Sequence, residues 1–507
     1  MKNSLLAALA ALLVPLSLAA QSAEVRRGAA TITQDDYAWR IGVIAHDSMQ
    51  GRNTPSPGLD KTAEWIASEF RRFGLKGGAQ DGAFIQRYPL VETAVDAEAS
   101  MLRVQGGATL RYGADVAPLR GGSTADATGS LVLVTGDPDP AALQRTDLAG
   151  KHVAIAFPAG TAGNRRALFG VLGAAGSSGA ASVMVVNGDD DAAWGSAAAA
   201  ALRPSVAWPS EERGGTGGSV PMLQVRAGAL AGVLQRAGVD PGRLQRSGAM
   251  EVTPVPGAML TLTQRVRTRP TSAPNVVGIL EGSDPELKDE YLVFSGHMDH
   301  VGMGTPDQNG DSIFNGADDD ASGTVAIVEV AEAMASLDPA PRRSVLFVIV
   351  SGEEKGLWGS QYFTDNPSVP VERMVANLNA DMVGRNWPDT IVAIGKEHSD
   401  LGETMNRVNE RHPELRMTAI DDIWPEERFY FRSDHFNFAR KGVPILFFFN
   451  GTHPDYHGRD DEPDRIDSEK AARISQLLFY LGMEVANADE RPKWNPESYK
   501  QIVSDGF

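Results

Sequence analysis

The 507-residue sequence contains no cysteine. Disulfide bridges, zinc sites built from cysteines and a lipoprotein anchor are therefore excluded. The hydrophobic content of 42% is ordinary for a globular protein, and the length is sufficient for two or three domains. The folded chain must therefore be stable without covalent cross-links.

Basic residues are too few to balance the acidic ones. The 47 lysines and arginines face 65 aspartates and glutamates, which gives a formal net charge of -18. Such a chain repels phosphate groups, so we expect it to bind neither nucleic acid nor an anionic membrane surface. Acidity alone does not identify a substrate.

Long hydrophobic runs are absent except near the N-terminus. Lys2 precedes an apolar run from Leu5 to about Leu18, and small residues suited to signal-peptidase cleavage follow it. The run is short for a bilayer span and Pro15 interrupts it, which argues against a membrane anchor. We therefore expect residues 1–23 to be a signal peptide. The protein is expected to be exported to the periplasm or the extracellular space without stable membrane insertion.

The middle of the chain differs in amino-acid composition from the segments on either side of it. Residues 24–95 include a helical pattern from about Lys61 to Phe73, which Gly74 is well placed to end. Residues 96–265 are rich in glycine, alanine and serine and carry short apolar strands. Those strands are expected at 130–135, 152–157 and 181–187. We interpret residues 96–265 as an inserted β-rich domain.

After Pro274, apolar strands alternate with helices. Strands are expected at 291–295, 344–351, 375–379, 390–394 and 445–450, with a helix at about 322–336. Fully apolar strands that alternate with helices predict an α/β fold. We expect a mostly parallel mixed sheet with helices on both faces, formed by residues 24–95 and 266–507.

Side chains that bind metals gather where these strands end. In open α/β sheets the carboxyl ends of the strands form the ligand-binding edge. Imidazole and carboxylate groups, with no thiolate available, suit zinc in a hydrolytic role. The five groups, in chain order, are Ser-Gly-His297-Met-Asp299-His300, Asp318-Asp319-Asp320, Glu353-Glu354, Asp381 and Asp455-Tyr-His457.

The spacing within two of these groups indicates different roles for neighbours. His297 and Asp299 are two residues apart, so their side chains point to the same face of an extended strand. Asp299 is therefore placed to fix the tautomer of His297 that binds metal. Glu353 and Glu354 point in different directions at a strand end. One of them can bind metal while the other faces an activated water.

Each group taken alone has a simpler explanation. An exposed glutamate pair is commonly a solvated surface, and Asp318 to Asp320 suit the N-terminus of the helix that follows them. A single histidine is more often structural than metal-binding. The presence of five such groups, most of them after an expected strand, favours a metal site.

In order and local sequence, the five groups resemble the co-catalytic two-zinc aminopeptidase family. Its relatives include glutamate carboxypeptidases and the catalytically silent transferrin receptors. The resemblance covers about residues 37–90 and 274–487. It implies two Zn²⁺ ions that share Asp319, with Glu353 as general base and Asp299 orienting a ligand. The other ligands implied are His297 and Asp381 at one ion, and Glu354 and His457 at the second.

The choice of Asp319 rests on its place as the last residue of Gly316-Ala-Asp-Asp319. In some relatives, a tyrosine two residues before Ser-Asp-His helps to hold the tetrahedral intermediate. Here Phe431 precedes Ser433-Asp434-His435, so either Tyr430 or another group must take that role. His435 and His453 are expected to be structural or to contact a ligand without binding metal.

The insert also resembles a known module. Thr146-Asp-Leu-Ala-Gly-Lys-His-Val-Ala-Ile-Ala, Gly173-Ala-Ala-Gly and Ala181-Ser-Val-Met-Val-Val-Asn are similar to a protease-associated domain. Such a domain would shape access to the site rather than perform chemistry. The alternative is a generic β-rich insert.

The resemblance implies a zinc exopeptidase, most readily an aminopeptidase that acts on peptides. Its substrate's free amine would need an acidic surrounding, which the loop Asp421–Glu427 would supply unless that loop is simply solvated. A carboxypeptidase or dipeptidase would instead need a cation, and Arg428 and Arg432 are available. A glutaminyl cyclase and a non-catalytic receptor-like binding protein are the remaining alternatives. Side-chain preference and oligomeric state stay open.

Overall fold

The computed structural model describes residues 23–119, 124–157, 165–188, 190–209 and 220–505. The expected signal peptide, residues 1–23, lies almost entirely outside them. The chain divides into two compact units. The larger unit combines the residues up to Tyr88 with Ser272–Phe507, and the smaller unit is Pro89–Thr271. Among the described residues, no helix is both long enough and apolar enough to cross a membrane.

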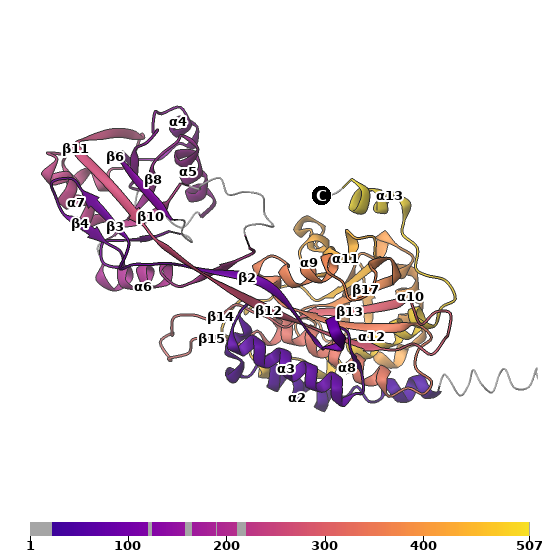
Figure 1. Cartoon of the computed structure of the whole chain (residues 1–507). Coiled ribbons are helices and arrows are strands. Elements are labelled where there is room, and N and C mark those ends of the chain that lie inside the picture. Colours follow the sequence, from indigo (N-terminus) through magenta and orange to yellow (C-terminus); the bar gives the residue numbers. More distant parts are fainter. Residues whose placement is uncertain (1–22, 120–123, 158–164, 189, 210–219, 506–507) are drawn as a thin grey trace, which may run out of the picture. The chain divides into compact units, whose positions relative to one another are not determined.

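The larger unit is built on one mixed sheet (Figure 1). Its strand order is β19-β18-β20-β17-β13-β16-β12-β2, and the short β1 pairs with β12. Strands β20, β17, β13 and β16 run parallel to one another. β12 is antiparallel to β16, and β18 is antiparallel to β20. The strands are β1 (Lys76–Gly77), β2 (Ile85–Val95), β12 (Val266–Leu280), β13 (Tyr291–His297), β16 (Ser344–Val350), β17 (Met374–Ala380), β18 (Thr390–Ile394), β19 (Thr418–Ile420) and β20 (Ile445–Phe449).

The central strands are buried along their whole length. Every residue of β16, Ser-Val-Leu-Phe-Val-Ile-Val, is buried, and so is every residue of β17. Continuous apolar strands of this kind occur where helices cover both faces of a parallel sheet. The expected α/β fold with a mixed sheet and helices on both faces is confirmed. The sheet is parallel at its centre, but β12 and β18 pair antiparallel with the strands beside them, so it is less parallel than expected.

Helices cover the two faces of this sheet (Figure 1). On one face, α2 (Gln34–Ile44), α3 (Pro57–Arg72), α8 (Gly323–Ala335) and α12 (Ser468–Asn487) pack against each other. On the other face, α9 (Trp358–Asp365) and α11 (His435–Ala439) contact each other and enclose an apolar core. The remaining helices are α10 (Leu401–Arg411) and α13 (Pro496–Tyr499).

Local chemistry explains where helix α3 begins. The helix starts at Pro57, four residues before the expected Lys61, because Ser56 accepts a hydrogen bond from the backbone N–H of Leu59. A proline is tolerated in the first turn, where its missing N–H would have no intrahelical partner. The expected end near Phe73 is one residue beyond the observed end at Arg72.

The smaller unit has its own sheet and core. Its strand order is β4-β3-β11-β6-β7-β8-β10-β5, and apolar clusters lie on both sides of the sheet. The strands of this sheet are β3 (Met101–Val104), β4 (Thr109–Arg111), β5 (Val116–Pro118), β6 (Ala125–Thr135), β7 (His152–Ile155), β8 (Ser182–Asn187), β10 (Met222–Arg226) and β11 (Glu251–Gln264), with helices α4 (Pro140–Gln144), α5 (Arg165–Ser177), α6 (Asp191–Ala201) and α7 (Ala227–Arg236). The short β9 (Ser205–Ala207) instead pairs with β2. Its identity as a protease-associated domain stays a prediction.

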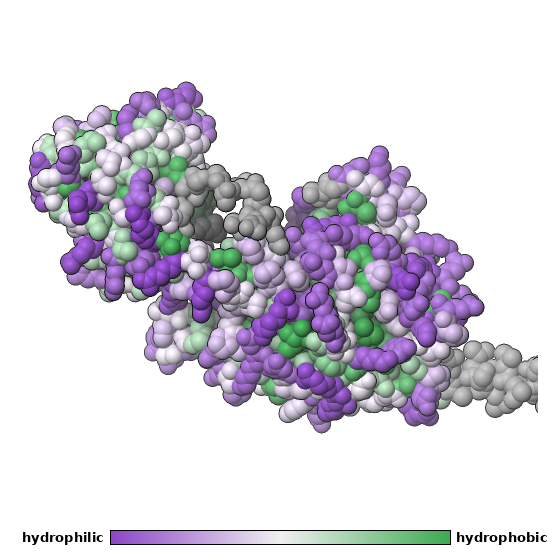
Figure 2. All heavy atoms as spheres, in the orientation of Figure 1, coloured by the Kyte–Doolittle hydropathy of each residue, from purple (hydrophilic) through white to green (hydrophobic). Residues whose placement is uncertain are grey.

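Exposed apolar side chains of the described residues form no broad band on the face shown in Figure 2. On the face shown in Figure 2, hydrophilic residues predominate and hydrophobic residues appear as small separate areas. Single exposed apolar side chains are normal on soluble domains.

Candidate metal centre

The first candidate side chains follow strand β13. His297 is the last residue of that strand, and its ring is 1% exposed. Its Nδ1 lies 3.2 Å from the backbone oxygen of Asp299 and 3.6 Å from the Asp299 carboxylate. Asp299 in turn accepts hydrogen bonds from the Thr54 hydroxyl at 2.8 Å and from the backbone N–H of Glu353 at 3.3 Å. His297 therefore directs its other nitrogen, Nε2, away from Asp299.

Asp319 lies in an irregular turn between the sheet and helix α8. Its Oδ1 is 3.5 Å from His297 Nε2, and its Oδ2 is 3.0 Å from His457 Nε2. The turn is preceded by Gly316, whose φ of 57° lies in the left-handed region that favours glycine. The two oxygens of one carboxylate therefore face two different imidazoles.

Two groups of metal-ligating atoms share Asp319. The first contains His297, Asp319 and Asp381, and the distance from His297 Nε2 to Asp381 Oδ2 is 3.6 Å. The second contains Asp319, Glu354, His457 and His300. In it, Glu354 Oε1 lies 3.1 Å from His457 Nε2 and 3.0 Å from His300 Nδ1. All five expected ligands are in these two groups.

Parallel strands explain why residues so far apart in sequence meet. His297 ends β13, the Glu353-Glu354 pair follows β16, and Asp381 follows β17. These three strands are adjacent and parallel, so their carboxyl ends lie at the same edge of the sheet. The hydroxyl of Ser433 donates a hydrogen bond to Asp381 Oδ2 at 2.9 Å and fixes that carboxylate.

A buried cation ties together the two segments that carry His297 and Asp319. The guanidinium of Arg52 is completely buried and donates to the backbone oxygens of Met298 at 2.7 Å and Gly316 at 2.8 Å. Charged side chains are rarely buried without compensation. Arg52 therefore holds the end of strand β13 against the turn that contains Asp319.

The electrostatics of the two groups call for a cation. Burial alone would lower the pKa of His457, but Asp319 and Glu354 outweigh it and raise the pKa to about 10. Burial also opposes the charge on His297, yet Asp320 and Asp381 raise its pKa well above the usual value. In the metal-free chain, protons on these imidazoles therefore supply the positive charge that the carboxylates require.

Unsatisfied polar atoms test whether this donor set fits a metal. Among the described residues, Asp319 Oδ2, Glu354 Oε1 and Asp381 Oδ1 are buried and make no well-aligned hydrogen bond. The first two face only imidazole nitrogens of the same groups, at 3.0 and 3.1 Å, and buried polar atoms are nearly always hydrogen-bonded, so this arrangement requires an explanation. Carboxylate and imidazole donors arranged in this way are those that zinc takes in catalytic sites. The residues present fit zinc.

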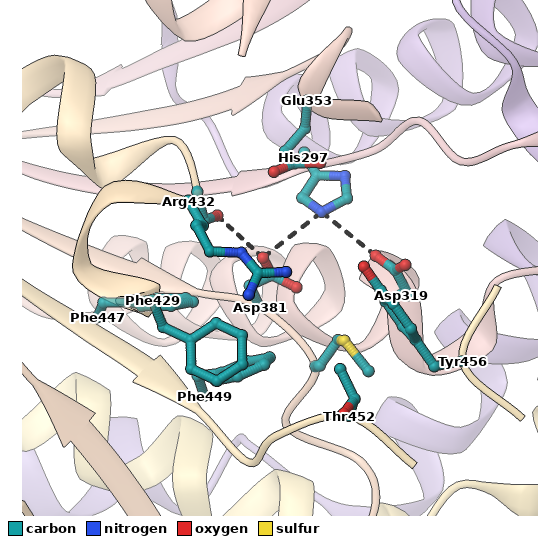
Figure 3. Close-up of a pocket in the computed structure, with 12 residues that line it drawn as sticks. His297, Asp319, Glu353, Asp381, Phe429, Arg432, Phe447, Phe449, Thr452 and Tyr456 are labelled. Carbon is teal, nitrogen blue, oxygen red and sulfur yellow. Dashed lines mark hydrogen bonds and ion pairs between the residues drawn. The ribbon is translucent and has the colours of Figure 1, made fainter. Parts of the chain in front are cut away.

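Figure 3 shows a pocket above the first group of ligands. His297 lies between Asp381 and Asp319, and Glu353 lies on the far side of the His297 ring. Burial raises the pKa of the Glu353 carboxyl well above its usual value, although His297 opposes the shift. The full lining is His297, Asp319, Glu353, Asp381, Met382, Phe429, Arg432, Ser433, Phe447, Phe449, Thr452 and Tyr456.

The segment that carries both groups of ligands is similar to a known peptidase family. Residues 275–482, which include every side chain of the two groups, match Peptidase family M28. This part of the chain is therefore similar to the M28 peptidases. A probable zinc metalloprotease of Pyricularia oryzae is 35% identical over 287 residues, which are 48% of this chain and 55% of that protein. The chain thus spans about half the length of the curated relatives it matches.

Solved structures of aminopeptidases share the fold. The aminopeptidase from Aneurinibacillus sp. strain AM-1 is similar with a TM-score of 0.54 and 18% identity, over 92% of this chain and 97% of that one. A zinc aminopeptidase from Bacillus subtilis has a TM-score of 0.55 and 18% identity, over 91% of this chain and 97% of that one. At this level of identity the similarity establishes a common fold.

Two possibilities that the sequence left open concern the surroundings of this site. Tyr430 is buried in the apolar core, and neither it nor Phe431 lines the pocket. Asp421 and Asp422 of the acidic loop line a separate cavity with Lys396 and Glu403. The loop therefore does not supply the acidic lining for which it was considered.

Three further histidines lie near the two groups of ligands. His435 shares a hydrogen bond with the backbone oxygen of Tyr430 at 2.8 Å, and burial lowers its pKa to about 4. His453 faces the Asp318 carboxylate at 3.2 Å, outside both groups of ligands. His300, which the sequence analysis did not single out as a ligand, lies inside the second group. Its position beside Asp299 in the motif was the available signal.

Proposed function

We propose that the protein is a zinc-dependent exopeptidase and, more specifically, an aminopeptidase that removes N-terminal residues from peptides. The observation that carries this proposal is the position of Asp319, whose two oxygens face two separate groups of ligands. Two adjacent metal ions beside a carboxylate base are a recurrent arrangement for hydrolysis. The M28 family match supports peptides as the substrate class.

Two Zn²⁺ ions would be held by side chains of both groups. His297 and Asp381 would hold one ion, Glu354 and His457 would hold the other, and Asp319 would bind both. When bound, zinc supplies a Lewis acid for the scissile carbonyl and lowers the pKa of an attacking water.

Glu353 is the residue proposed to move the proton. It lines the pocket beside His297, and its own position is fixed where its backbone N–H donates to Asp299. A carboxyl with a raised pKa can accept a proton from water and deliver it to the leaving amine. Such general base catalysis contributes about 10²- to 10⁴-fold to the rate.

Tyr456 is the proposed donor to the oxygen that develops charge. It lines the pocket and its ring stacks on that of His457 at a centroid distance of 4.0 Å. Burial and the charges of Asp319 and Glu354 raise the pKa of the phenol above its usual value, so it stays protonated and able to donate. It takes the role that neither Phe431 nor the buried Tyr430 can fill.

An aromatic wall on one side of the pocket favours a large apolar side chain at the cleaved residue. Phe429 and Phe449 contact each other with ring centroids 4.8 Å apart, and Phe447 lies 5.2 Å from Phe449 (Figure 3). Apolar pockets bind aliphatic and aromatic groups by removing their surface from water. The substrate residue is therefore proposed to be aromatic or a long aliphatic.

One observation favours a carboxypeptidase or dipeptidase as the second candidate. Arg432 lines the same pocket and would receive a substrate's terminal carboxylate. Its guanidinium is, however, already paired with Glu427 at 3.1 Å and lies over the Phe429 ring at 4.7 Å. This pairing reduces the charge that Arg432 offers to a ligand, and the aminopeptidase assignment is preferred.

A panel of three peptides tests the assignment. The three peptides share one sequence that begins with phenylalanine. One has both termini free, one is acetylated at the N-terminus and one is amidated at the C-terminus. Each is assayed with and without a chelator. The proposal expects cleavage of the free and amidated peptides, loss of cleavage on acetylation and inhibition by the chelator. Equal cleavage of the acetylated peptide contradicts it. Loss of cleavage on amidation alone replaces it with the carboxypeptidase.

A further inference from the structure

His300 occupies an unusual position for a histidine. Its side chain is completely buried, and neither ring nitrogen has a hydrogen-bond partner among the described residues. Its Nδ1 lies 3.0 Å from Glu354 Oε1 and 3.5 Å from Asp319 Oδ2. A buried imidazole without a hydrogen bond is costly, unless another partner takes its lone pair.

The surrounding chain makes room for this ring. A Cβ atom at Gly316 would meet the Cγ of His300 at 2.5 Å, so no side chain is tolerated there. The backbone N–H of His300 donates to the backbone oxygen of Arg52 at 3.3 Å. His300 is therefore fixed in place by contacts on its backbone and on one face of its ring.

The spacing of the donor atoms matches a closed zinc site. Tetrahedral zinc with bonds of about 2.1 Å places its donors about 3.4 Å apart. In the second group, the imidazole nitrogens lie 3.0, 3.0, 3.1 and 3.5 Å from the carboxylate oxygens. The second group therefore offers four protein donors at the right spacing, whereas the first offers three.

We propose that His300 binds the second zinc ion through Nδ1, as a fourth protein ligand beside Asp319, Glu354 and His457. This inference rests on the proposed two-zinc function. The two metal sites are then unequal. The second site is closed by protein and holds its ion tightly, while the first keeps an open position for water and substrate.

Metal affinity measures this inequality without any assay of activity. The zinc-free protein is titrated with zinc in competition with a chromophoric chelator, which gives two dissociation constants. In the His300→Ala variant one constant is expected to rise about 100-fold or more, and the other to change little. His453→Ala is the matched control, because His453 is also buried with unpartnered ring nitrogens but lies outside both groups. It is expected to keep both constants.

X-ray absorption at the zinc edge provides a second test on the unaltered protein. With two ions bound, the proposal expects three imidazole ligands per pair of ions, from His297, His300 and His457. Two imidazoles per pair would overturn it even if His300→Ala failed to fold.

The outcomes also separate this inference from the function on which it rests. If the unaltered protein binds two zinc ions and His300→Ala binds both equally well, the role of His300 is wrong and the proposed function stands. If His453→Ala weakens zinc binding as much as His300→Ala, the effect is one of packing and the proposal fails. If the unaltered protein binds no zinc, the proposed function itself fails.

Discussion

The carboxylate of Asp461 accepts a hydrogen bond from the backbone N–H of Asp319 at 3.1 Å. The same carboxylate also accepts from the backbone N–H of Asp318 at 2.9 Å. Asp461 is completely buried, so it satisfies two amides that water does not reach. Asp461, which is not itself a proposed ligand, therefore stabilises the turn that contains Asp319.

Replacing Asp461 tests this support. Asp461→Ala leaves two buried N–H groups without an acceptor, at a cost of about 1–3 kcal/mol each in the free energy of unfolding. Zinc affinity should fall as well, because Asp319 loses its fixed position. Asp461→Asn keeps one acceptor oxygen, so its stability and zinc affinity should lie between those of the unaltered protein and those of Asp461→Ala. Denaturant unfolding and zinc titration measure both effects, and unchanged stability in Asp461→Ala would exclude the role.

Glu353→Gln is expected to separate metal binding from proton transfer. The amide keeps the size of the side chain but cannot act as a base, so kcat should fall by about 10²- to 10⁴-fold. Because Glu353 is not among the proposed ligands, the zinc content should stay the same. Elemental analysis beside steady-state kinetics checks this. A variant that lost zinc would show that Glu353 is a ligand.

Glu354→Gln should have the opposite signature. It removes a charged oxygen donor from the second group of ligands, so one zinc ion should bind much more weakly. Activity should partly return when zinc is added in excess. The measurement is activity against zinc concentration for both glutamate variants. If excess zinc rescued Glu353→Gln rather than Glu354→Gln, the two roles would be exchanged.

The aromatic wall of the pocket predicts the preferred substrate residue. Phe449→Leu shortens one side of the pocket, so the kcat/KM ratio for a phenylalanyl over an alanyl substrate should fall by up to about tenfold. Phe363→Leu is the control, because Phe363 is buried in the same core but does not line the pocket. Its ratio should not change. Equal ratios in both variants would place the substrate side chain elsewhere.

Raised pKa values predict how the metal-free chain responds to pH. Burial raises the pKa of Asp434 to about 7, and the carboxylates around His457 raise its pKa to about 10. Both groups bind protons more tightly folded than unfolded, so stability falls as pH rises. The loss of stability occurs between about pH 4 and pH 7 for Asp434, and between about pH 6.5 and pH 10 for His457.

Chemical denaturation of the metal-free protein at about pH 6 and about pH 9 measures this effect. The midpoint should be lower at the higher pH. Zinc takes the place of the proton on His457, so the difference should shrink when zinc is bound. A metal-free protein that became more stable at the higher pH would contradict the assignment.

The sequence predicts those parts of the fold whose pattern is local. The strand expected at 390–394 coincides with β18, and the strand expected at 344–351 ends one residue beyond β16. An apolar run bounded by polar residues is sufficient to place such strands. The helix expected at about 322–336 is observed from Gly323 to Ala335. The turn before it depends on contacts from Asp461 and Arg52, which no local pattern contains.

The site was predictable as far as its residues follow strands. His297, Glu354 and Asp381 each stand at or just after the end of a strand, and the parallel sheet brings those ends together. His300 belongs to the first of the five groups, but the sequence did not assign it as a ligand. Its participation depends on the space left by Gly316, and that space is visible only after folding. The acidic loop Asp421–Glu427 could be interpreted either as pocket lining or as a solvated loop, because charge alone does not locate a loop.

The larger unit is assembled from two segments of chain that flank the smaller one. Its first helices, α2 and α3, leave the ribosome early, but the strands they cover are not yet made. Domains generally fold as units during synthesis. The larger unit cannot fold as a unit until its second segment has been synthesised. The smaller unit is complete first. The N-terminal helices meanwhile carry exposed apolar faces, and only once His457 has emerged can the last ligand join the others.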